Sequence, residues 1–200
     1  MLLASSNAGK LQEFRVLASQ YSSIAAVDPQ LLPNFSQIPE FEESAPTFAE
    51  NAAGKAIYYS RWSHLPVIAD DSGLVVDALD GAPGVRSARY AGPGASDAQR
   101  NAKVLDELRA APADRRSARF VCVITLARRG QPMGVFSGSV EGEIIGAPRG
   151  PDGFGYDPVF FLSALGKTFA ELPLAEKNIY SHRGKAFRKL LAFLAAPRVL

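Results

Sequence analysis

The sequence contains little of the chemistry that stabilises small secreted proteins or builds transition-metal sites. Its 200 residues include one cysteine and two histidines. A single thiol excludes an internal disulfide, and we interpret Cys122, which lies in an apolar run, as a buried core residue and not as a nucleophile. A metal site in such a chain depends on oxygen ligands, which select hard cations.

Long apolar runs and an excess of one charge are also missing. No stretch reaches the roughly 18 consecutive apolar residues that a membrane span needs, and the first seven residues lack the features of a secretory signal. With 22 basic and 20 acidic residues, the formal charge of +2 gives no field that favours nucleic acid or an anionic membrane. We therefore expect a cytoplasmic protein that binds neither nucleic acid nor a membrane.

Apolar residues are abundant, at 47% of the chain. This content suits one large globular domain over residues 1–200 with a substantial core, or two lobes on one continuous sheet. Strands are expected at residues 119–127, 134–144 and 159–161, and helices at residues 96–110 and from Ser181 onward. The helix at 96–110 should begin with a capping box, because Gln99 follows Ser96 by three residues. The strands at 119–127 and 134–144 should be antiparallel, so we predict a mixed sheet.

Two adjacent acids follow a short apolar run at residues 67–69. Asp70 and Asp71 are followed by Ser72 and Gly73, and a second apolar run then begins. We predict a buried strand, a hairpin-like turn that carries the acids, and a second strand over residues 74–79, because open α/β folds place their sites at strand ends. Since neighbouring side chains of a strand face opposite ways, the two acids should have different roles.

The N-terminal residues are typical of a strand at 2–4, a polar turn and a helix. The turn at residues 5–10 leaves backbone N–H groups available to an anion, and Lys10 adds a positive charge. Ala4 and Leu11 stand where a Walker A loop has glycine and Ser or Thr, so that motif is excluded. Phosphate binding and an ordinary capped helix both remain open interpretations.

An acidic stretch precedes the next predicted helix. After an expected strand at residues 24–27 and a loop, Glu42 and Glu43 lead to Thr47, whose spacing from Glu50 is that of a capping box. The helix should run over residues 48–62, with Asn51 and Lys55 on one face. Acid runs and helical lysines are ordinarily solvated, so these residues become candidates only if the fold brings them together.

Two later stretches are candidates for ligand binding. Three glycines, two aromatic residues and two aspartates fall within residues 150–158, where the backbone can approach a flat ligand while Phe154 or Tyr156 stacks on it. A tight turn anchored by its aromatic residues is the alternative. His182 and Arg183 fall in the first turn of the last helix, where positive charge is unfavourable unless an anion or a carbonyl oxygen is bound.

These signals together predict an enzyme that cleaves a phosphoanhydride. Magnesium prefers a few carboxylates plus phosphate oxygens, and an aspartate can both orient a water molecule and hold the metal. The candidate phosphate-binding cations are Lys10, Lys55, Lys177 and Arg183, and the candidate acids for a hard divalent cation are Asp70, Asp71, Glu42 and Glu43.

Seven ordered motifs carry a family resemblance. They are Ser-Ser-Asn-Ala-Gly-Lys (5–10), Thr-Phe-Ala-Glu-Asn-Ala (47–52), Ala-Asp-Asp-Ser-Gly-Leu (69–74), Gly-Ala-Pro-Gly (81–84), Ser-Ala-Arg-Tyr (87–90), Gly-Phe-Gly-Tyr-Asp-Pro (153–158) and Ser-His-Arg-Gly-Lys-Ala (181–186). Together they strongly resemble the inosine triphosphate pyrophosphatase family, which hydrolyses non-standard purine nucleoside triphosphates (ITP, dITP, XTP). The resemblance implies an elongated mixed α/β fold with the active site in a cleft between two lobes, a homodimer, and dependence on Mg²⁺.

The resemblance also implies roles for single residues. Asp71 would be the proton acceptor and a metal ligand, Glu42 or Glu43 the second metal ligand, and Asp70 and Asn51 supporting groups. The contacts to substrate would come from Ser5, Ser6, Asn7, Ala8, Gly9, Lys10, Lys55, Ser72, Phe154, Gly155, Tyr156, Asp157, Lys177, His182 and Arg183. Water would attack the α-phosphorus and release the monophosphate and pyrophosphate.

The sequence keeps two rival functions open. The first is a related pyrophosphatase that acts on other modified or pyrimidine nucleotides, with the same acids and lysines but a different base pocket. The second is a nucleotide-binding module without turnover, although the retention of both Asp70 and Asp71 argues against it. Donors such as Arg183 that meet a 6-oxo group would reject the 6-amino group of adenine.

Overall fold

Seven strands form one sheet in the order β2-β1-β3-β4-β5-β6-β7 in the computed structural model, which describes residues 1–197. Parallel pairing joins β1 to β2 and β3, whereas β6 is antiparallel to both β5 and β7. Only two residues connect the neighbouring strands β4 and β5, so this pair is antiparallel as well. The predicted mixed sheet is therefore confirmed. The strands are β1 (Leu2–Leu3), β2 (Gln30–Leu31), β3 (Val67–Val76), β4 (Ser117–Arg128), β5 (Gln131–Ile144), β6 (Phe160–Leu162) and β7 (Lys167–Thr168).

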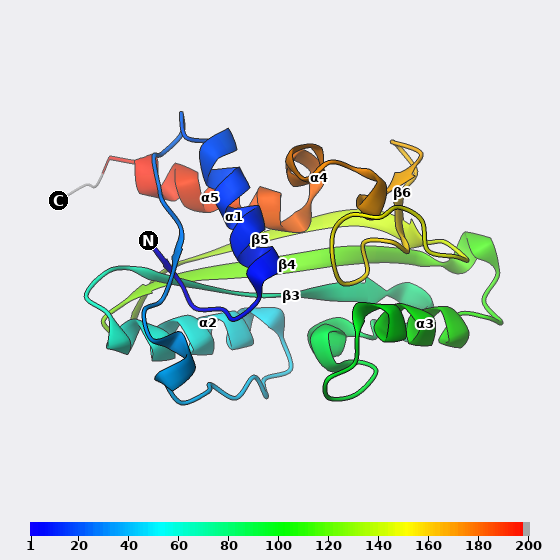
Figure 1. The fold of residues 1–200 in the computed structure, drawn as a ribbon, viewed down its shortest axis with the longest axis horizontal. Helices are drawn as coiled ribbons and strands as arrows, with labels where there is room; N and C mark the ends of the chain where they lie inside the picture. Colours follow the sequence, from blue (N-terminus) through cyan, green and yellow to red (C-terminus); the bar gives the residue numbers. More distant parts are fainter. Residues whose placement is uncertain (198–200) are drawn as a thin grey trace. The chain divides into compact units, whose positions relative to one another are not determined.

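Helices flank this sheet (Figure 1). Two begin at the caps that the sequence predicts: the Thr47 side chain accepts a hydrogen bond from the Glu50 N–H at 3.2 Å, and Ser96 and Gln99 form a complete capping box. Within the described part of the chain, no helix is long and apolar enough to cross a membrane. The α-helices are α1 (Ala8–Gln20), α2 (Phe48–Tyr59), α3 (Asp97–Glu107), α4 (Leu174–Tyr180) and α5 (His182–Ala195).

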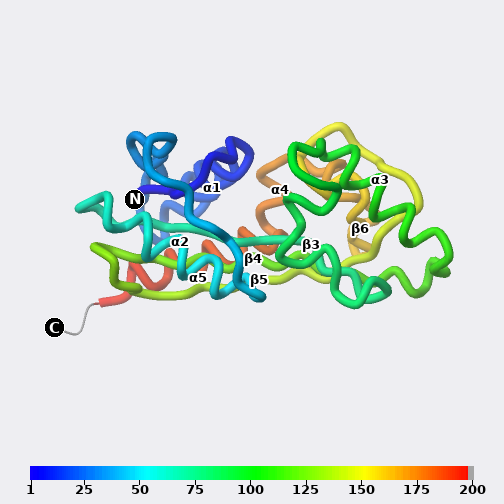
Figure 2. Tube along the Cα trace, turned by 90° about the horizontal axis from the view of Figure 1, so that it is seen from below, coloured from blue at the N-terminus to red at the C-terminus, as the bar shows by residue number. Residues whose placement is uncertain are grey.

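The chain divides into two compact units, and three strands contribute to both. Of the described residues, unit 1 contains 1–71, 122–138 and 182–197, and unit 2 contains 72–121 and 139–181. The divisions fall inside β3, β4 and β5, whose course can be followed in Figure 2.

The core of unit 1 lies on both faces of the sheet, because the side chains of β1 and β3 alternate. Ile68 packs with the helices α1 and α5, whose Phe14 and Phe187 rings lie 5.3 Å apart. Val67 and Ala69 instead pack with Ala56 of α2. The two faces of β3 therefore belong to different helices.

Unit 2 has its own core around α3 and the central strands. Phe120, Phe160 and Phe169 form an aromatic cluster, with ring centroids 4.6 Å apart for Phe120 and Phe160 and 5.2 Å for Phe160 and Phe169. Val104 of α3 and Leu108, the residue that caps the C-terminus of α3, pack into the same cluster of buried residues. Tyr156 belongs to this core as well, so the glycine-rich loop is anchored from within the unit.

The predicted hairpin at the two acids is wrong. Residues 67–76 form one continuous strand, and residues 77–79 form a 3₁₀ turn instead of a second strand. Leu74 and Val76 are fully buried, so the packing of these side chains outweighs the local turn preference of Ser72 and Gly73. The acids therefore lie in the middle of a strand.

Other boundaries differ from the prediction in smaller ways. No strand forms at residues 24–27, since β1 pairs instead with Gln30 and Leu31 of β2. The helix expected over residues 48–62 ends at Tyr59 and continues as a 3₁₀ turn. Lys177 lies within α4, a short helix that no pattern in the sequence indicated.

Candidate functional site

Asp70 and Asp71 lie in the part of β3 that packs against α1, α2 and α5 of unit 1. Their relative exposures are 1% and 6%. Asp70 points to the α1 and α5 face, where it meets Lys10 and Arg183, and Asp71 points to the α2 face, where it meets Asn51. The expectation that the two acids face different ways is therefore confirmed.

Asp71 combines burial with partly opposing charges. Burial and the nearby carboxylate of Glu43 raise its pKa to about 6, although Lys55 acts in the opposite direction. Asn51 Nδ2 donates a hydrogen bond to Asp71 Oδ2 at 3.2 Å. A carboxyl group with this pKa changes its protonation state close to neutral pH, which suits a general base.

The structure distinguishes the two candidate glutamates. Glu43 forms an ion pair with Lys55, which is on the face of α2 that also carries Asn51, and its charge acts on Asp71. Glu42 is exposed. Of the two, Glu43 is therefore the acid that the fold brings to Asp71.

Asp70 belongs to a buried ionic network. Its Oδ2 atom lies 3.0 Å from Lys10 Nζ and 3.3 Å from a terminal nitrogen of Arg183, and Arg183 also forms an ion pair with Glu13. Burial alone would raise the pKa of Asp70, but the charges of Lys10 and Arg183 outweigh it and hold the pKa well below its usual range. Asp70 is thus a permanent anion that holds Lys10 in position.

The loop at residues 5–10 is a capped helix start that retains donors for an anion. Asn7 is the N-cap of α1, its Oδ1 accepts the Lys10 N–H at 3.0 Å, and its own N–H donates to Ser5 Oγ at 3.1 Å. Ala8 and Gly9, the first two helical residues, have N–H groups without an intrahelical acceptor. The two interpretations left open by the sequence are compatible, because the cap leaves these N–H groups for a phosphate.

The two candidate residues at the start of the last helix are closely packed. His182 and Arg183 begin α5 and are buried, at 4% and 2% exposure. Gly138 of β5 allows the strand to lie close to the backbone of α5, because a Cβ atom at residue 138 would be only 2.7 Å from the Ala186 nitrogen. In this structure Arg183 donates to carboxylates of the protein, Glu13 and Asp70.

A second group of candidates gathers in unit 2. Lys177 Nζ lies 2.5 Å from Asp157 Oδ2, 4.9 Å from the centre of the Phe154 ring and 5.5 Å from that of Phe169. Asp157 Oδ2 also accepts the Phe154 N–H at 2.9 Å. The ring of Phe154 is half-buried, so a cation lies beneath an aromatic surface that a planar ligand can reach.

The structure thus brings the predicted residues together in two groups. The group in unit 1 comprises Glu43, Asn51, Lys55, Asp70, Asp71, Lys10 with its loop, His182 and Arg183, and the group in unit 2 comprises Phe154, Gly155, Tyr156, Asp157 and Lys177, with Ser72 as the first residue of that unit. Sequence reasoning missed Glu13. Its spacing of four residues from Leu17 on the apolar face of α1 was the available signal that it is buried.

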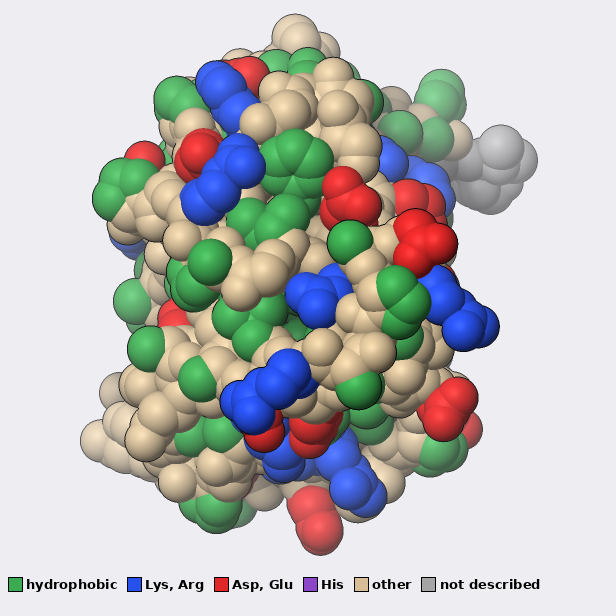
Figure 3. Space-filling model, turned by 90° about the vertical axis from the view of Figure 1, so that its right-hand side faces the viewer, with side chains coloured by type: hydrophobic (Ala, Val, Ile, Leu, Met, Phe, Trp, Pro, Cys, Tyr) green, Lys and Arg blue, Asp and Glu red, His purple; other side chains and the backbone are tan. Residues whose placement is uncertain are grey.

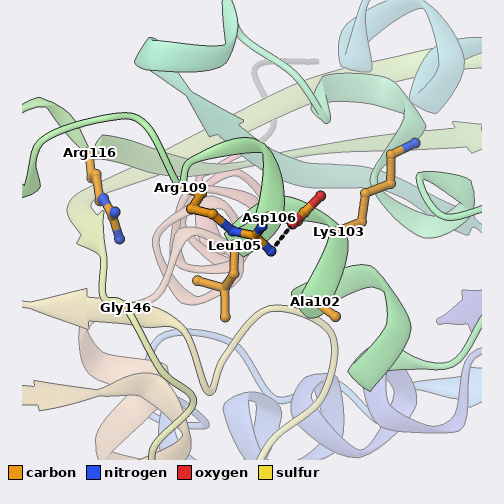
Figure 4. Close-up of a pocket in the computed structure, with 7 residues that line it drawn as sticks. All are labelled: Ala102, Lys103, Leu105, Asp106, Arg109, Arg116 and Gly146. Carbon is orange, nitrogen blue, oxygen red and sulfur yellow. Dashed lines mark hydrogen bonds and ion pairs between the residues drawn. The ribbon is translucent and has the colours of Figure 1, made fainter.

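A hollow beside α3 contains none of these candidates. Figure 4 shows its lining residues, Ala102, Lys103, Leu105, Asp106, Arg109, Arg116 and Gly146. Arg116 donates to the carbonyl groups of Leu108 and Ala111, and Arg109 is paired with Asp106. Basic and acidic side chains are likewise interspersed on the face drawn in Figure 3. Both arginines of the hollow are therefore already hydrogen-bonded or ion-paired within the protein.

Known proteins with similar sequences agree with the family that the seven sequence motifs resemble. A dITP/XTP pyrophosphatase of Geobacillus kaustophilus is 50% identical over 190 residues, which are 95% of this chain and 91% of the relative. One of Geobacter sulfurreducens is 48% identical over 190 residues, 95% and 94% of the two chains. The solved structure of a HAM1 protein from Coxiella burnetii is 43% identical, covers 96% of each chain and has a TM-score of 0.83. Residues 1–193 match the model of the Ham1 family, and the chain belongs to this family.

Proposed function

We propose that this protein hydrolyses non-standard purine nucleoside triphosphates, namely ITP, dITP and XTP, to the nucleoside monophosphate and pyrophosphate. The names of its relatives support this activity, since those at 48% and 50% identity are dITP/XTP pyrophosphatases. The structural observation that carries the proposal is a buried Asp71, with a pKa of about 6, beside Glu43 and Lys55.

Asp71 acts as the general base. Its carboxylate takes a proton from a water molecule while the water oxygen bonds to the α-phosphorus, and the bond from that phosphorus to the bridging oxygen breaks so that pyrophosphate leaves. A pKa near neutrality keeps much of the group ionised at physiological pH while making it basic enough to accept the proton. Asn51, through its bond to Oδ2, fixes the direction of the carboxylate.

Asp71 and Glu43 would hold a Mg²⁺ ion. Among the described residues no group of three or more His, Cys, Asp and Glu side chains forms a metal cage. Two carboxylates fit Mg²⁺ well, because this ion is commonly bound by one or two carboxylates plus water and substrate phosphates. The carboxylates of Glu43 and Asp71 repel each other, and a divalent cation bound between them would relieve this repulsion. When bound, the ion polarises phosphoryl oxygens and neutralises developing charge.

The phosphate chain is held by the first turn of α1 and by two lysines. Residues 5–10 supply backbone N–H groups at the positive end of the helix. Lys10 and Lys55 each contact a carboxylate in the structure, Asp70 and Glu43 respectively, and the positive charge of each lysine lowers the pKa of Asp71.

We assign the binding of the base and sugar to Phe154, Gly155, Tyr156, Asp157 and Lys177, which lie in unit 2 with Ser72, and we keep His182 and Arg183 of unit 1 as further substrate contacts. Phe154 offers a half-buried ring for stacking, and Lys177 lies under that ring. Donors placed for a 6-oxo group remain unpaired against the 6-amino group of adenine, and this loss discriminates strongly between purines. We also propose that the protein is a homodimer and that it is located in the cytoplasm. Sedimentation analysis would test the homodimer.

The test of this function is pyrophosphate release from a panel of nucleotides with and without Mg²⁺. We expect rapid release from ITP, dITP and XTP and slow release from ATP, GTP and dTTP. Equal rates on ITP, XTP, GTP and dTTP would contradict the preference for non-standard purines and support a broader pyrophosphatase. Binding without any release in the presence of Mg²⁺ would support a module without turnover.

A further inference from the structure

Two side chains of α3 hold both polar groups of one residue in the glycine-rich loop. Asp97 Oδ2 accepts the Gly155 N–H at 2.7 Å, and Asn101 Nδ2 donates to the Gly155 carbonyl oxygen at 3.1 Å. Because Asp97 and Asn101 are four residues apart, they lie on one face of the helix. The helix therefore holds both of the peptide groups that flank the Cα atom of Gly155.

The loop needs such a support because of its conformation. Gly155 has φ = +64°, a left-handed value that favours glycine, although a Cβ atom there would meet nothing within 4 Å. The flanking residues are Phe154, whose ring is half-buried, and Tyr156, whose hydroxyl group donates to the Ser87 carbonyl oxygen at 2.9 Å. The direction of the Phe154 ring thus depends on how the Gly155 backbone is held.

Stability alone does not account for Asn101. It is 4% exposed, and its Oδ1 atom is buried without a hydrogen-bond partner in the described part of the chain. A half-satisfied buried amide is unfavourable, whereas apolar side chains suit this helix, as Val104 and Leu108 of the same unit show. What the amide supplies is the bond to Gly155.

We propose that Asn101 is a positioning residue that determines how tightly the 154–157 loop recognises the nucleotide base. The inference rests on the proposed function, in which Phe154 stacks on the base. Asn101 acts through the Gly155 backbone and makes no contact with the phosphates, so its loss should weaken base recognition and leave the chemistry on the α-phosphorus largely intact.

The test compares Asn101→Leu, which removes the amide at similar volume, with Val104→Ala, which disturbs the same helix without touching Gly155. We expect Asn101→Leu to raise KM for XTP and dITP by about five- to tenfold, the equivalent of one neutral hydrogen bond, with kcat changed by less than about threefold. Hydrogen exchange of the 154–157 segment should become faster in Asn101→Leu. Val104→Ala should lower the unfolding midpoint while leaving KM and this local exchange unchanged.

The exchange measurement separates failure of the inference from failure of the proposed function. Unchanged exchange and unchanged KM in Asn101→Leu, with active wild-type enzyme, would overturn the positioning role alone. An equal rise of KM in Val104→Ala would show that general destabilisation is the cause and would also overturn it. If the wild type released no pyrophosphate from any nucleotide, the proposed function would fail, and faster exchange in Asn101→Leu would still establish that Asn101 orders the loop.

Discussion

Asn51 Nδ2 lies 3.2 Å from Asp71 Oδ2, and the same carboxamide also binds the backbone of Ala45, whose N–H and C=O it meets at 3.0 and 3.1 Å. Ala45 stands two residues after Glu43. One buried amide therefore connects the strand that carries the proposed base with the loop that carries the second proposed metal ligand. The positions of these two acids depend on one another through Asn51.

Replacing Asp71 by asparagine should remove turnover. A general base contributes roughly 10²–10⁴-fold to the rate, so we expect kcat for XTP to fall by at least about 10³-fold when the carboxylate is also lost as a metal ligand. Nucleotide affinity should change less, because Lys10, Lys55 and the start of α1 remain. Steady-state kinetics together with calorimetric binding of a nonhydrolysable analogue would check this, and near-normal hydrolysis would remove Asp71 from its role.

Glu42 and Glu43 form a matched pair for testing the metal site. Glu43→Gln should raise the Mg²⁺ concentration for half-maximal activity by at least about tenfold, because Glu43 is the acid whose charge reaches Asp71. Glu42→Gln should leave that concentration unchanged, since Glu42 is exposed. Magnesium titrations of both variants would decide the assignment, and a larger effect in Glu42→Gln would reverse it.

Local signals in the sequence predicted a large part of the fold and of the site. The caps at Thr47 and Ser96 are local hydrogen-bond motifs, and both start helices where expected. Alternation along a strand separates Asp70 from Asp71 without any knowledge of their partners. The spacing of Asn51 and Lys55 placed them on one face of α2, and both contact acids in the structure.

Other features depend on contacts that no local pattern carries. The Ser72–Gly73 pair favours a turn, but burial of Leu74 and Val76 keeps β3 extended through it. The ion pair of Glu13 with Arg183 joins residues that are 170 positions apart. The support of Gly155 by Asn101 likewise could not be predicted locally, since the sequence indicated only a helix over residues 96–110 and a glycine-rich stretch at residues 150–158.

The pKa of Asp71 predicts a gain of stability in the metal-free Asp71→Asn variant. The folded value is about 6 and the ordinary value is 3.8. Between these values the folded state binds more protons than the unfolded state, so the stability of the wild type falls as pH rises through this interval. Above about pH 6 the variant should therefore be more stable by about 2–3 kcal/mol, with the difference vanishing below about pH 4. Urea unfolding in EDTA at pH 4 and pH 8 would measure it, and equal stability at pH 8 would contradict the raised pKa.

Asp70→Asn should have the opposite effect in the same assay. The pKa of Asp70 is lowered in the folded state, so its stabilising contribution is present above its ordinary value of 3.8 and is lost as pH falls below that value. At pH 8 the substitution leaves Arg183 and Lys10 with one carboxylate fewer, and removing one partner of a buried ion pair costs about 3–5 kcal/mol.

The two substitutions change adjacent aspartates to the same amide, so volume and backbone effects are closely matched. Asp70 lies between the cations Lys10 of α1 and Arg183 of α5, and its negative charge compensates theirs. Asp71 lies beside Glu43, so its negative charge is unfavourable until a cation or a proton is bound. Opposite signs at pH 8 in EDTA are therefore expected, and added Mg²⁺ should stabilise the wild type and Asp70→Asn more than Asp71→Asn. The same sign for both substitutions would show that burial, and not the surrounding charge, governs this part of β3.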